Sequence, residues 1–324
     1  MKFYVGVEFG VKQIVAGVTD KNGKLLRKAS CPTNLNRPYE IQFVEIAQLI
    51  YSILEEEGID IKSVKSIGVG FPGIPNKDKG TIIRNYTMNI VNLPVREELQ
   101  KHFKIPIYVD NDANCAALAE SVVGAAEDID FSVLVRIGNG IGGGIIINNV
   151  IYSGFNYAGA ELGHMCIAMG GNECSCGRKG CWEAYASAPA FLRQVTEAAQ
   201  KHPESLINTL AQKDAAGITL FTAFEAAKQC DTVAAEVIDT YLHYLGEGLI
   251  NIVNMLMPNA IIIAGELSRL GESFLKPLRC IVWKGIYTQD VDKPEFKIAQ
   301  LGSAGIVVGA AMLGLYSSNE EDIA

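Results

Sequence analysis

Residues 5–20, VGVEFGVKQIVAGVTD, and residues 134–149, LVRIGNGIGGGIIINN, follow the same plan. In each stretch an apolar strand runs into a turn that contains glycine, and a second apolar strand follows. Glycine reaches the positive φ angles that tight hairpin turns require, and runs of Val and Ile favour strands. The repetition of one pattern in two distant parts of the chain predicts a duplicated domain.

Between and after these two hairpins, strands and helices alternate. Apolar side chains at positions 43, 46, 50 and 53 recur every three or four residues, which predicts an amphipathic helix over residues 39–58. Further strands are expected at residues 66–73, 105–114, 260–265 and near 296–302, and further helices at 116–123, 188–201, 233–256, after 268 and at 304–316. This alternation indicates an α/β protein with parallel or mixed sheets, in which ligands bind beyond the carboxyl ends of strands.

The length of 324 residues and a hydrophobic content of 49% predict a large core and two domains. We expect an N-terminal α/β domain over residues 1–115 and a larger α/β domain over residues 116–303. The C-terminal segment 304–324 is expected to join the first domain.

The net charge of −8 argues against general binding to nucleic acid, because phosphate binding requires clustered Lys and Arg. No apolar run approaches the roughly 18 residues of a membrane-spanning helix. The N-terminal sequence MKFYVGVEFG lacks the charged start and long apolar stretch of a signal peptide. We therefore expect a cytoplasmic protein without membrane contact.

One segment, AELGHMCIAMGGNECSCGRKGCWEAYAS, carries the spacing of a metal site. The four candidate ligands are His164, Cys174, Cys176 and Cys181. Three thiolates and one imidazole complete the tetrahedral shell of zinc and leave no position for water, so the predicted ion is structural. The other five of the eight cysteines are expected to be small core residues in a reducing cytosol.

Short polar side chains gather at the end of the strand expected at 105–114, where the sequence reads Asp-Asn-Asp-Ala-Asn. A carboxylate such as Asp112 can serve as a general base toward a hydroxyl, and a carboxamide such as Asn111 can both donate and accept hydrogen bonds. The alternative is a helix N-cap or Asx turn. Glu161 and Glu183 flank the cysteine segment and could accept bonds from sugar hydroxyls, or could be solvated surface residues.

The two glycine turns form a third candidate site. Residues 138–144 hold five glycines in seven positions, whereas residues 6–10 hold two in five. Exposed backbone N–H groups in such turns can bind phosphate oxygens, although neither turn matches the Walker pattern.

With these motifs together, the chain resembles the ROK family of bacterial sugar kinases and sugar-responsive repressors over nearly its whole length. The resemblance implies an actin/hexokinase-like (ribonuclease H-like) duplicated two-domain sugar kinase fold with an interdomain cleft, and a homodimer or homotetramer. It implies glucose or a related hexose as substrate, phosphorylated at its primary hydroxyl, with ATP and Mg²⁺ as cosubstrate and its metal. Asp112 would be the catalytic base. The sugar contacts would be Gly73, Asn111, Asp112, Glu161, His164 and Glu183, and the nucleotide contacts Gly10, Lys12, Gly138, Asn139, Gly140, Gly142 and Gly265.

The nucleotide side departs from the family pattern. The family's first phosphate turn reads Asp-x-Gly-Gly-Thr-Lys, whereas residues 8–13 read Glu-Phe-Gly-Val-Lys-Gln. Val11 places a branched side chain where backbone should face phosphate, and Lys12 could supply a replacement positive charge. The alternative function is therefore a sugar-binding regulator or sensor with weak or no kinase activity. Family repressors carry an N-terminal helix-turn-helix, but here a strand is expected from Phe3, so we expect no binding to nucleic acid.

Overall fold

The computed structural model describes residues 2–212 and 214–316. Within the described residues, the chain forms two compact units: unit 1 holds residues 2–134, 143–160 and 299–316, and unit 2 holds residues 135–142, 161–212 and 214–298. The division into domains at residues 1–115 and 116–303 stays a prediction. Of the segment 304–324, residues 317–324 lie outside the described residues, and residues 305–316 form the last helix, α10 (Gly305–Tyr316), in unit 1.

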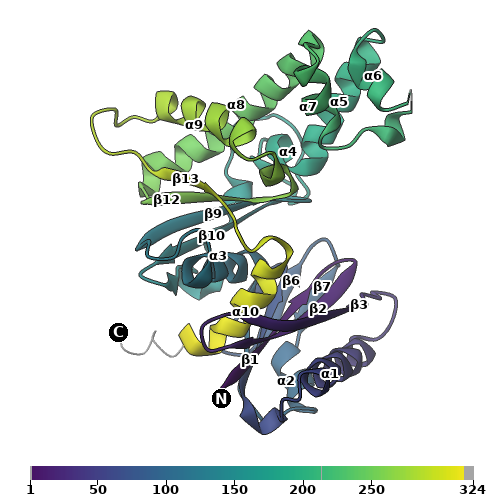
Figure 1. Ribbon diagram of the computed structural model, residues 1–324, viewed down its shortest axis with the longest axis vertical. Coiled ribbons are helices and arrows are strands. Elements are labelled where there is room, and N and C mark those ends of the chain that lie inside the picture. The colour runs from purple at the N-terminus through teal and green to yellow at the C-terminus, as the bar shows by residue number, and fades with distance from the viewer. Residues whose placement is uncertain (1, 213, 317–324) are drawn as a thin grey trace. The chain divides into compact units, whose positions relative to one another are not determined.

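The first sheet has the strand order β3-β2-β1-β4-β8, of which Figure 1 labels β3, β2 and β1. Its strands are β1 (Phe3–Phe9), β2 (Gln13–Asp20), β3 (Leu25–Pro32), β4 (Val64–Phe71) and β8 (Ile107–Asn111). The hairpin strands β1, β2 and β3 pair antiparallel, whereas β4 pairs parallel with both β1 and β8. The parallel pairing brings the carboxyl ends of β4 and β8 to one edge, where Phe71 is opposite Asn111.

The second sheet has the order β11-β10-β9-β12-β13. Its strands are β9 (Phe131–Ile137), β10 (Ile141–Ile147), β11 (Val150–Ile151), β12 (Ala260–Gly265) and β13 (Glu295–Ile298). Numbered along the chain within each sheet, both orders read third, second, first, fourth, fifth. The outer pairs also agree, since β10 and β11 are antiparallel and β12 and β13 are parallel. The duplication predicted from the two glycine hairpins is confirmed.

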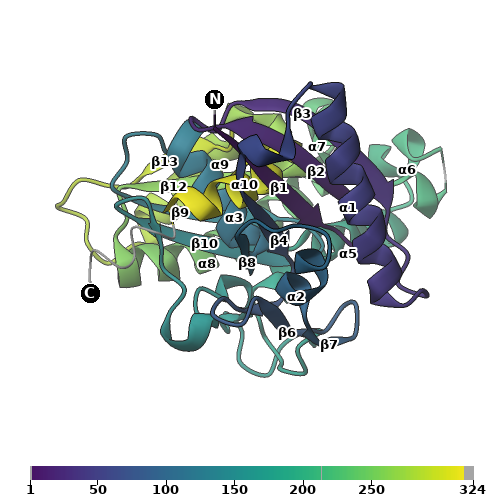
Figure 2. The same ribbon diagram turned by 90° about the horizontal axis from the view of Figure 1, so that it is seen from below.

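Helix α1 (Tyr39–Glu56) packs on β2 and β3 of the first sheet (Figure 2). The face predicted from the apolar spacing is buried, with Phe43, Ile46, Ile50 and Ile53 each at most 1% exposed. They join a core in which the rings of Phe9 and Phe71 stack with centroids 4.4 Å apart. Burial of each such side chain contributes about 1.5–3 kcal/mol to folding.

Helix α10 lies directly on β1 and β4 and against α3 (Asp112–Val123). A Cβ at Gly6 would lie 1.8 Å from the carbonyl oxygen of Val307, and a Cβ at Gly68 would lie 1.8 Å from that of Ala310. The assignment of Gly6 to a phosphate turn was therefore wrong. Gly6 lies inside β1, and its missing side chain lets the helix backbone approach the sheet.

The sequence patterns missed other elements. Helix α3 begins at Asp112, four residues before the predicted start, because the polar residues thought to end the strand open the helix. A small sheet of β5 (Ile74–Asn76), β6 (Thr81–Asn85) and β7 (Ile90–Leu93) was not predicted. The remaining helices are α2 (Val95–Gln100), α4 (Glu183–Ala186), α5 (Ala188–Lys201), α6 (Leu206–Leu210), α7 (Thr222–Lys228), α8 (Thr232–Leu256) and α9 (Glu272–Gly285). The 3-10 helices are η1 (Ile61–Ser63), η2 (Phe155–Tyr157), η3 (Leu162–His164), η4 (Ala215–Gly217), η5 (Glu266–Leu270) and η6 (Gly302–Ala304).

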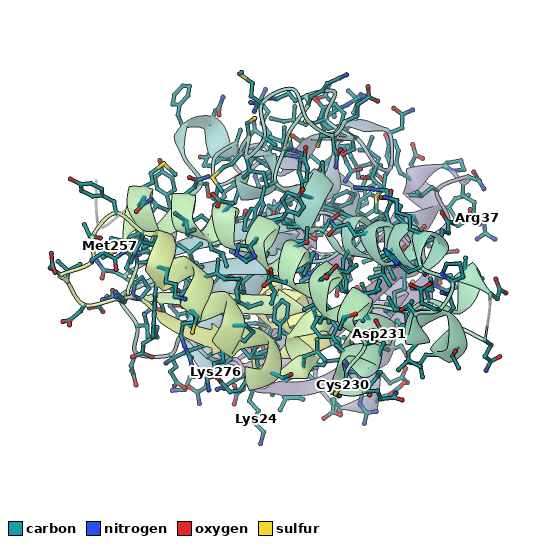
Figure 3. The ribbon with its side chains drawn as sticks, turned by 90° about the horizontal axis from the view of Figure 1, so that it is seen from above. Lys24, Arg37, Cys230, Asp231, Met257 and Lys276 are labelled. Carbon is teal, nitrogen blue, oxygen red and sulfur yellow. The ribbon has the colours of Figure 1, made fainter. Side chains whose placement is uncertain are left out.

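The expectation that the five scattered cysteines are core residues was mostly wrong. Among them, all within the described residues, Cys115 is buried and Cys31 is half-buried, whereas Cys166, Cys230 and Cys280 are exposed. Cys230 occupies a turn with φ of 64° between α7 and α8, and Figure 3 labels it beside Asp231. In the described part of the chain, no helix is both long enough and apolar enough to cross a membrane.

Candidate functional site

The polar cluster at the end of β8 is organised around Asn111. Its Oδ1 accepts hydrogen bonds from the backbone N–H groups of Ala113 (2.8 Å) and Asn114 (3.4 Å), so Asn111 is the N-cap of α3. Asp112 is then the first residue of the helix, where the positive end of the helix dipole favours a negative charge. The N-cap interpretation is therefore correct for Asn111, and α3 begins at the next residue, Asp112.

Gly73 and Asn111, predicted to share a ligand, are in direct contact in unit 1. The Nδ2 of Asn111 donates to the carbonyl oxygen of Gly73 at 3.0 Å. Gly73 has φ of 112°, and a Cβ there would lie 2.4 Å from the carbonyl oxygen of Arg84. Only glycine fits this turn, which brings its backbone to the end of β8.

Asp110, the first residue of the predicted polar cluster, forms an ion pair with Lys77, which the sequence patterns did not single out. Lys77 Nζ lies 2.7 Å from Asp110 Oδ2, with side chains 17% and 2% exposed. Asp110 Oδ1 accepts from the backbone N–H of Asn111 (2.7 Å) and from Asn114 Nδ2 (2.9 Å). In the sequence, Asn-Lys-Asp-Lys-Gly reads as a solvated turn, so only the fold shows that Lys77 points inward.

The four predicted metal ligands converge in unit 2. Their ligand atoms all lie within 4.8 Å of one another. The sulfurs of Cys176 and Cys181 are 3.7 Å apart, and the sulfur of Cys174 is 3.6 Å from Nδ1 of His164. A tetrahedral zinc ion with Zn–S bonds of about 2.3 Å separates two sulfur ligands by roughly 3.8 Å. The donor set and its spacing therefore fit a structural zinc ion.

The pKa values of the three thiols in this cluster are shifted in different directions. Burial raises the pKa of Cys174 far above its usual value, and burial also raises the pKa of Cys181. Burial acts in the same direction on Cys176, but hydrogen bonds from the backbone N–H of Arg178 and from the other two thiols lower the pKa of Cys176 overall. Such crowded, mutually bonded thiols are typical of groups that share a cation.

Glu183 connects the cysteine cluster to the second glycine turn. Its Oε1 lies 3.1 Å from the sulfur of Cys174 and 3.8 Å from Nδ1 of His164. Its Oε2 accepts from the backbone N–H of Ile141 at 3.4 Å, and a Cβ at Gly140 would lie 2.4 Å from this oxygen. Three predicted sugar contacts are linked to one another through His164. Its backbone N–H donates to the carbonyl oxygen of Glu161, and its Nδ1 lies 3.8 Å from Oε1 of Glu183.

The first glycine turn consists of Gly10, Val11 and Lys12 between β1 and β2. The backbone N–H of Gly10 donates to the carbonyl oxygen of Gln13 at 3.0 Å, so it already has a partner. Thr33, the residue after β3, also holds the turn, because its hydroxyl donates to the carbonyl oxygen of Gly10 at 2.7 Å. Val11 and Lys12 are exposed. This turn therefore presents side chains to its surroundings more than it presents free amides.

The second glycine turn brings its predicted residues together in unit 2. The backbone N–H of Gly138 donates to the carbonyl of Gly140 at 2.9 Å, and Asn139 at the tip is exposed. Gly142 follows in β10. Gly265, at the end of β12, has φ of 108°, and a Cβ there would lie 2.0 Å from the carbonyl oxygen of Ile137. Gly265 thus adjoins the start of this turn.

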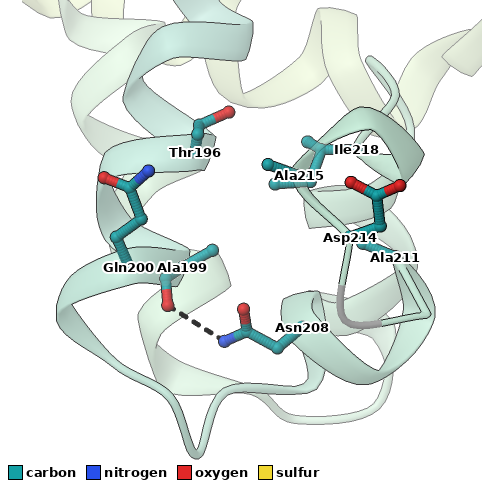
Figure 4. Close-up of a pocket in the computed structure, with 8 residues that line it drawn as sticks. All are labelled: Thr196, Ala199, Gln200, Asn208, Ala211, Asp214, Ala215 and Ile218. Atoms are coloured by element: carbon teal, nitrogen blue, oxygen red, sulfur yellow. Dashed lines mark hydrogen bonds between the residues drawn. The ribbon is translucent and has the colours of Figure 1, made fainter.

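A separate pocket of about 180 Å³ lies between α5, α6 and η4. Figure 4 shows Asn208 at its base, where its Nδ2 donates to the carbonyl of Ala199 at 3.0 Å. The residues that line this pocket include none of those predicted for metal, sugar or nucleotide.

The sheets and the residues at their edges define an α/β protein of the actin- and hexokinase-like class. The model of the ROK family matches residues 4–316, so the chain belongs to the ROK family.

The relatives that this chain matches include both sugar kinases and repressors. The chain is 33% identical over 313 residues to a glucokinase of Halalkalibacterium halodurans, covering 96% of this chain and 94% of the relative. It is 29% identical over 311 residues to the xylose repressor of Bacillus subtilis, covering 96% of this chain and 76% of the relative. A solved ROK family glucokinase of Streptomyces griseus, in complex with glucose and AMPPNP, matches with a TM-score of 0.83 and 30% identity, covering 96% of this chain and 98% of that one.

Proposed function

We propose that the protein is an ATP-dependent sugar kinase that phosphorylates the primary hydroxyl of glucose or a related hexose. The observation that carries the proposal is the placement of Asp112 as the first residue of α3, directly after Asn111, whose carboxamide ties the helix start to Gly73. The similarity to glucokinases over nearly the full lengths of both chains supports it.

In the proposed reaction, the carboxylate of Asp112 accepts the proton of the primary hydroxyl as that oxygen attacks the γ-phosphorus of ATP. The bond from the γ-phosphorus to the bridging oxygen breaks, and the products are the sugar phosphate and ADP. Mg²⁺ bound with ATP neutralises charge on the phosphates. Because general base catalysis contributes typically 10²–10⁴-fold, Asp112 is the side chain on which turnover should depend most.

The proposed sugar contacts are polar groups, each with contacts inside its own unit. Asn111 Nδ2 uses one hydrogen on Gly73 and has a second one to donate. Glu161 and Glu183 would accept from hydroxyls, and His164 would act both as a sugar contact and as a zinc ligand with Cys174, Cys176 and Cys181. When bound, zinc would stiffen the segment that carries these acceptors.

ATP would contact both glycine turns. Gly138, Asn139, Gly140 and Gly142 would approach the phosphates with their backbone, and Gly265 would border the same region. At the first turn, Gly10 supplies the tight bend and Lys12 supplies an exposed positive charge. A point charge on a flexible stem is a suitable partner for phosphate.

A second candidate function is a sugar-binding regulator with little or no kinase activity. One observation favours it: the backbone N–H of Gly10 is already bonded to Gln13, and Val11 occupies the turn. The similarity to xylose repressors is consistent with this candidate.

A coupled assay that detects ADP, run with ATP, Mg²⁺ and a panel of glucose, mannose, fructose and N-acetylmannosamine, separates the two candidates. The kinase proposal predicts turnover with at least one hexose. If no sugar is phosphorylated while one of them still raises the melting temperature, the regulator candidate is correct.

A further inference from the structure

The segment after β4 is fastened to the start of α3 at two points. The first is the hydrogen bond from Asn111 Nδ2 to the carbonyl of Gly73. The second is the ion pair between Lys77 Nζ and Asp110 Oδ2 at 2.7 Å. Gly73 and Lys77 lie four residues apart on one side, and Asp110 and Asn111 are consecutive on the other. The two contacts therefore fix the orientation of β8's end relative to the Gly73 turn.

Asp110 is almost fully buried, and its contacts with Lys77, Asn111 and Asn114 hold this connection in place. Its Oδ1 accepts from the backbone N–H of Asn111 and from Asn114 Nδ2, while its Oδ2 meets Lys77. A buried carboxylate that loses its cation is strongly unfavourable and pulls in water or changes position. Because the same carboxylate holds the N–H of Asn111, a shift of Asp110 would move Asn111 and the helix start at Asp112.

A third segment of unit 1 meets the same lysine. Lys77 Nζ lies 5.5 Å from the centroid of the Tyr157 ring, and the Tyr157 hydroxyl donates to Asp78 Oδ1 at 2.7 Å. Tyr157 has φ of 64°, a conformation that costs energy for a residue other than glycine and persists where surrounding contacts determine it. Lys77 is thus held in place by an aromatic ring on one side while it holds Asp110 on the other.

We propose that Lys77 is a positioning residue for phosphoryl transfer, which acts by neutralising Asp110 and thereby aligning Asn111 with the sugar and Asp112 with its primary hydroxyl. This inference rests on the proposed kinase function. Misplacement of a reacting group by about 1 Å can cost about 100-fold in rate. The effect should therefore appear chiefly in kcat, with a smaller effect on sugar affinity through Asn111 and none on ATP.

The test compares wild type with Lys77→Met, with the double variant Lys77→Met/Asp110→Asn, and with Lys228→Met as a matched control. Lys228 pairs with Glu225 on the surface of α7, where the side chains are 61% and 52% exposed. For Lys77→Met we expect kcat to fall at least about tenfold, sugar affinity to fall about fivefold, and KM for ATP to stay within about twofold. The double variant should recover part of the lost kcat, because no unpaired carboxylate is left. Lys228→Met should match wild type.

The outcomes separate this inference from the kinase proposal. If wild type is active and Lys77→Met has the kcat and sugar affinity of Lys228→Met, the positioning role is wrong and the kinase proposal stands. If Lys77→Met does not fold, the double variant decides: a reduced kcat with unchanged KM for ATP supports the role, and a KM for ATP that is impaired as much as kcat overturns it. If wild type turns over no sugar, the kinase proposal fails. Titration with hexose then decides whether Lys77 orients Asn111. Equal hexose affinities in wild type and Lys77→Met would overturn that role. A wild type that binds none of the hexoses overturns both.

Discussion

The end of β8 and the turn after β1 belong to the same sheet, yet they are built in different ways. The end of β8 is held by side-chain contacts. Asn111 caps α3 and donates to the carbonyl oxygen of Gly73, and Asp110 forms an ion pair with Lys77. In the turn after β1, the backbone N–H of Gly10 bonds Gln13, and Val11 and Lys12 are exposed. The first region is fixed by interlocking polar side chains, whereas the turn after β1 is held through the backbone of Gly10 and presents the exposed side chains of Val11 and Lys12. Loss of a side chain should therefore affect the sugar side more than the nucleotide side.

The largest effect should follow from Asp112→Asn. Without a carboxylate to accept the proton, turnover should fall at least about 1,000-fold. Sugar affinity should stay within a few-fold, because Asn111, not Asp112, caps the helix. Steady-state kinetics and titration with the preferred hexose measure the two quantities. Asp60→Asn, at the exposed cap of η1, is the control and should leave both unchanged. A large loss of sugar affinity in Asp112→Asn would show that Asp112 chiefly binds.

The next effect concerns the metal cluster, and it tests whether the cluster supports the sugar side selectively. Cys181 is fully buried, and its replacement by Ser removes one of four ligands. We expect Cys181→Ser to lose bound zinc, to melt at lower temperature, and to bind sugar about 10–100-fold more weakly, with KM for ATP within about twofold.

Metal content by elemental analysis, melting temperature and sugar titration check this expectation. The exposed Cys280→Ser is the matched control and should retain wild-type zinc. Equal losses of sugar and ATP binding in Cys181→Ser would mean that the cluster does not act on one side alone.

The sequence predicted side-chain chemistry better than backbone geometry. Spacing alone selected His164, Cys174, Cys176 and Cys181 as a candidate metal shell, and their ligand atoms lie within 4.8 Å of one another. The repeated hairpins predicted a duplicated domain, and the two sheets have the same strand order. Lys77 could not be found in this way, since its partner Asp110 is 33 positions away and the pairing exists only once β4 and β8 lie side by side. The role of Gly6 also escaped prediction, because it depends on where α10 packs.

A smaller effect should come from the nucleotide side, in the direction of gain. Val11→Gly removes a branched side chain from the turn that would face phosphate, so KM for ATP should fall by about threefold, or about 0.7 kcal/mol at 25 °C. Sugar affinity should not change, because the substitution touches none of the bonds around Asn111. Kinetics at varied ATP measure the effect. A raised or unchanged KM for ATP would place the first turn away from the phosphates.

The smallest effect on activity is expected from Asp231→Asn. This variant tests whether a general loss of stability changes the binding of sugar or of ATP. Asp231 caps α8 through Ala234 and also accepts from Ser205 and Leu206. Burial raises the pKa of Asp231, but these donated hydrogen bonds outweigh it and hold the pKa below its usual value. The carboxylate therefore stabilises the fold above the unfolded-state pKa of about 4, and this contribution is lost as the pH falls through the lower folded-state pKa.

Asp231→Asn should lower the free energy of unfolding by about 1 kcal/mol at neutral pH and flatten its fall in acid. Denaturant unfolding across pH checks both, and kcat and both KM values should match wild type. A lower sugar affinity in Asp231→Asn would mean that reduced stability alone can weaken sugar binding more than ATP binding.

In the proposed reaction, the cluster at the end of β8 binds a hexose and directs its primary hydroxyl to ATP. The most direct measurement is phosphorus NMR of reactions containing ATP, Mg²⁺ and the hexose that most raises the melting temperature, with wild type and Asp112→Asn side by side. We expect wild type to yield one phosphomonoester, on the primary hydroxyl, for each ADP formed, and Asp112→Asn to yield none in the same time. A phosphate on another hydroxyl, ADP and free phosphate without sugar phosphate, or equal product from both proteins would contradict it.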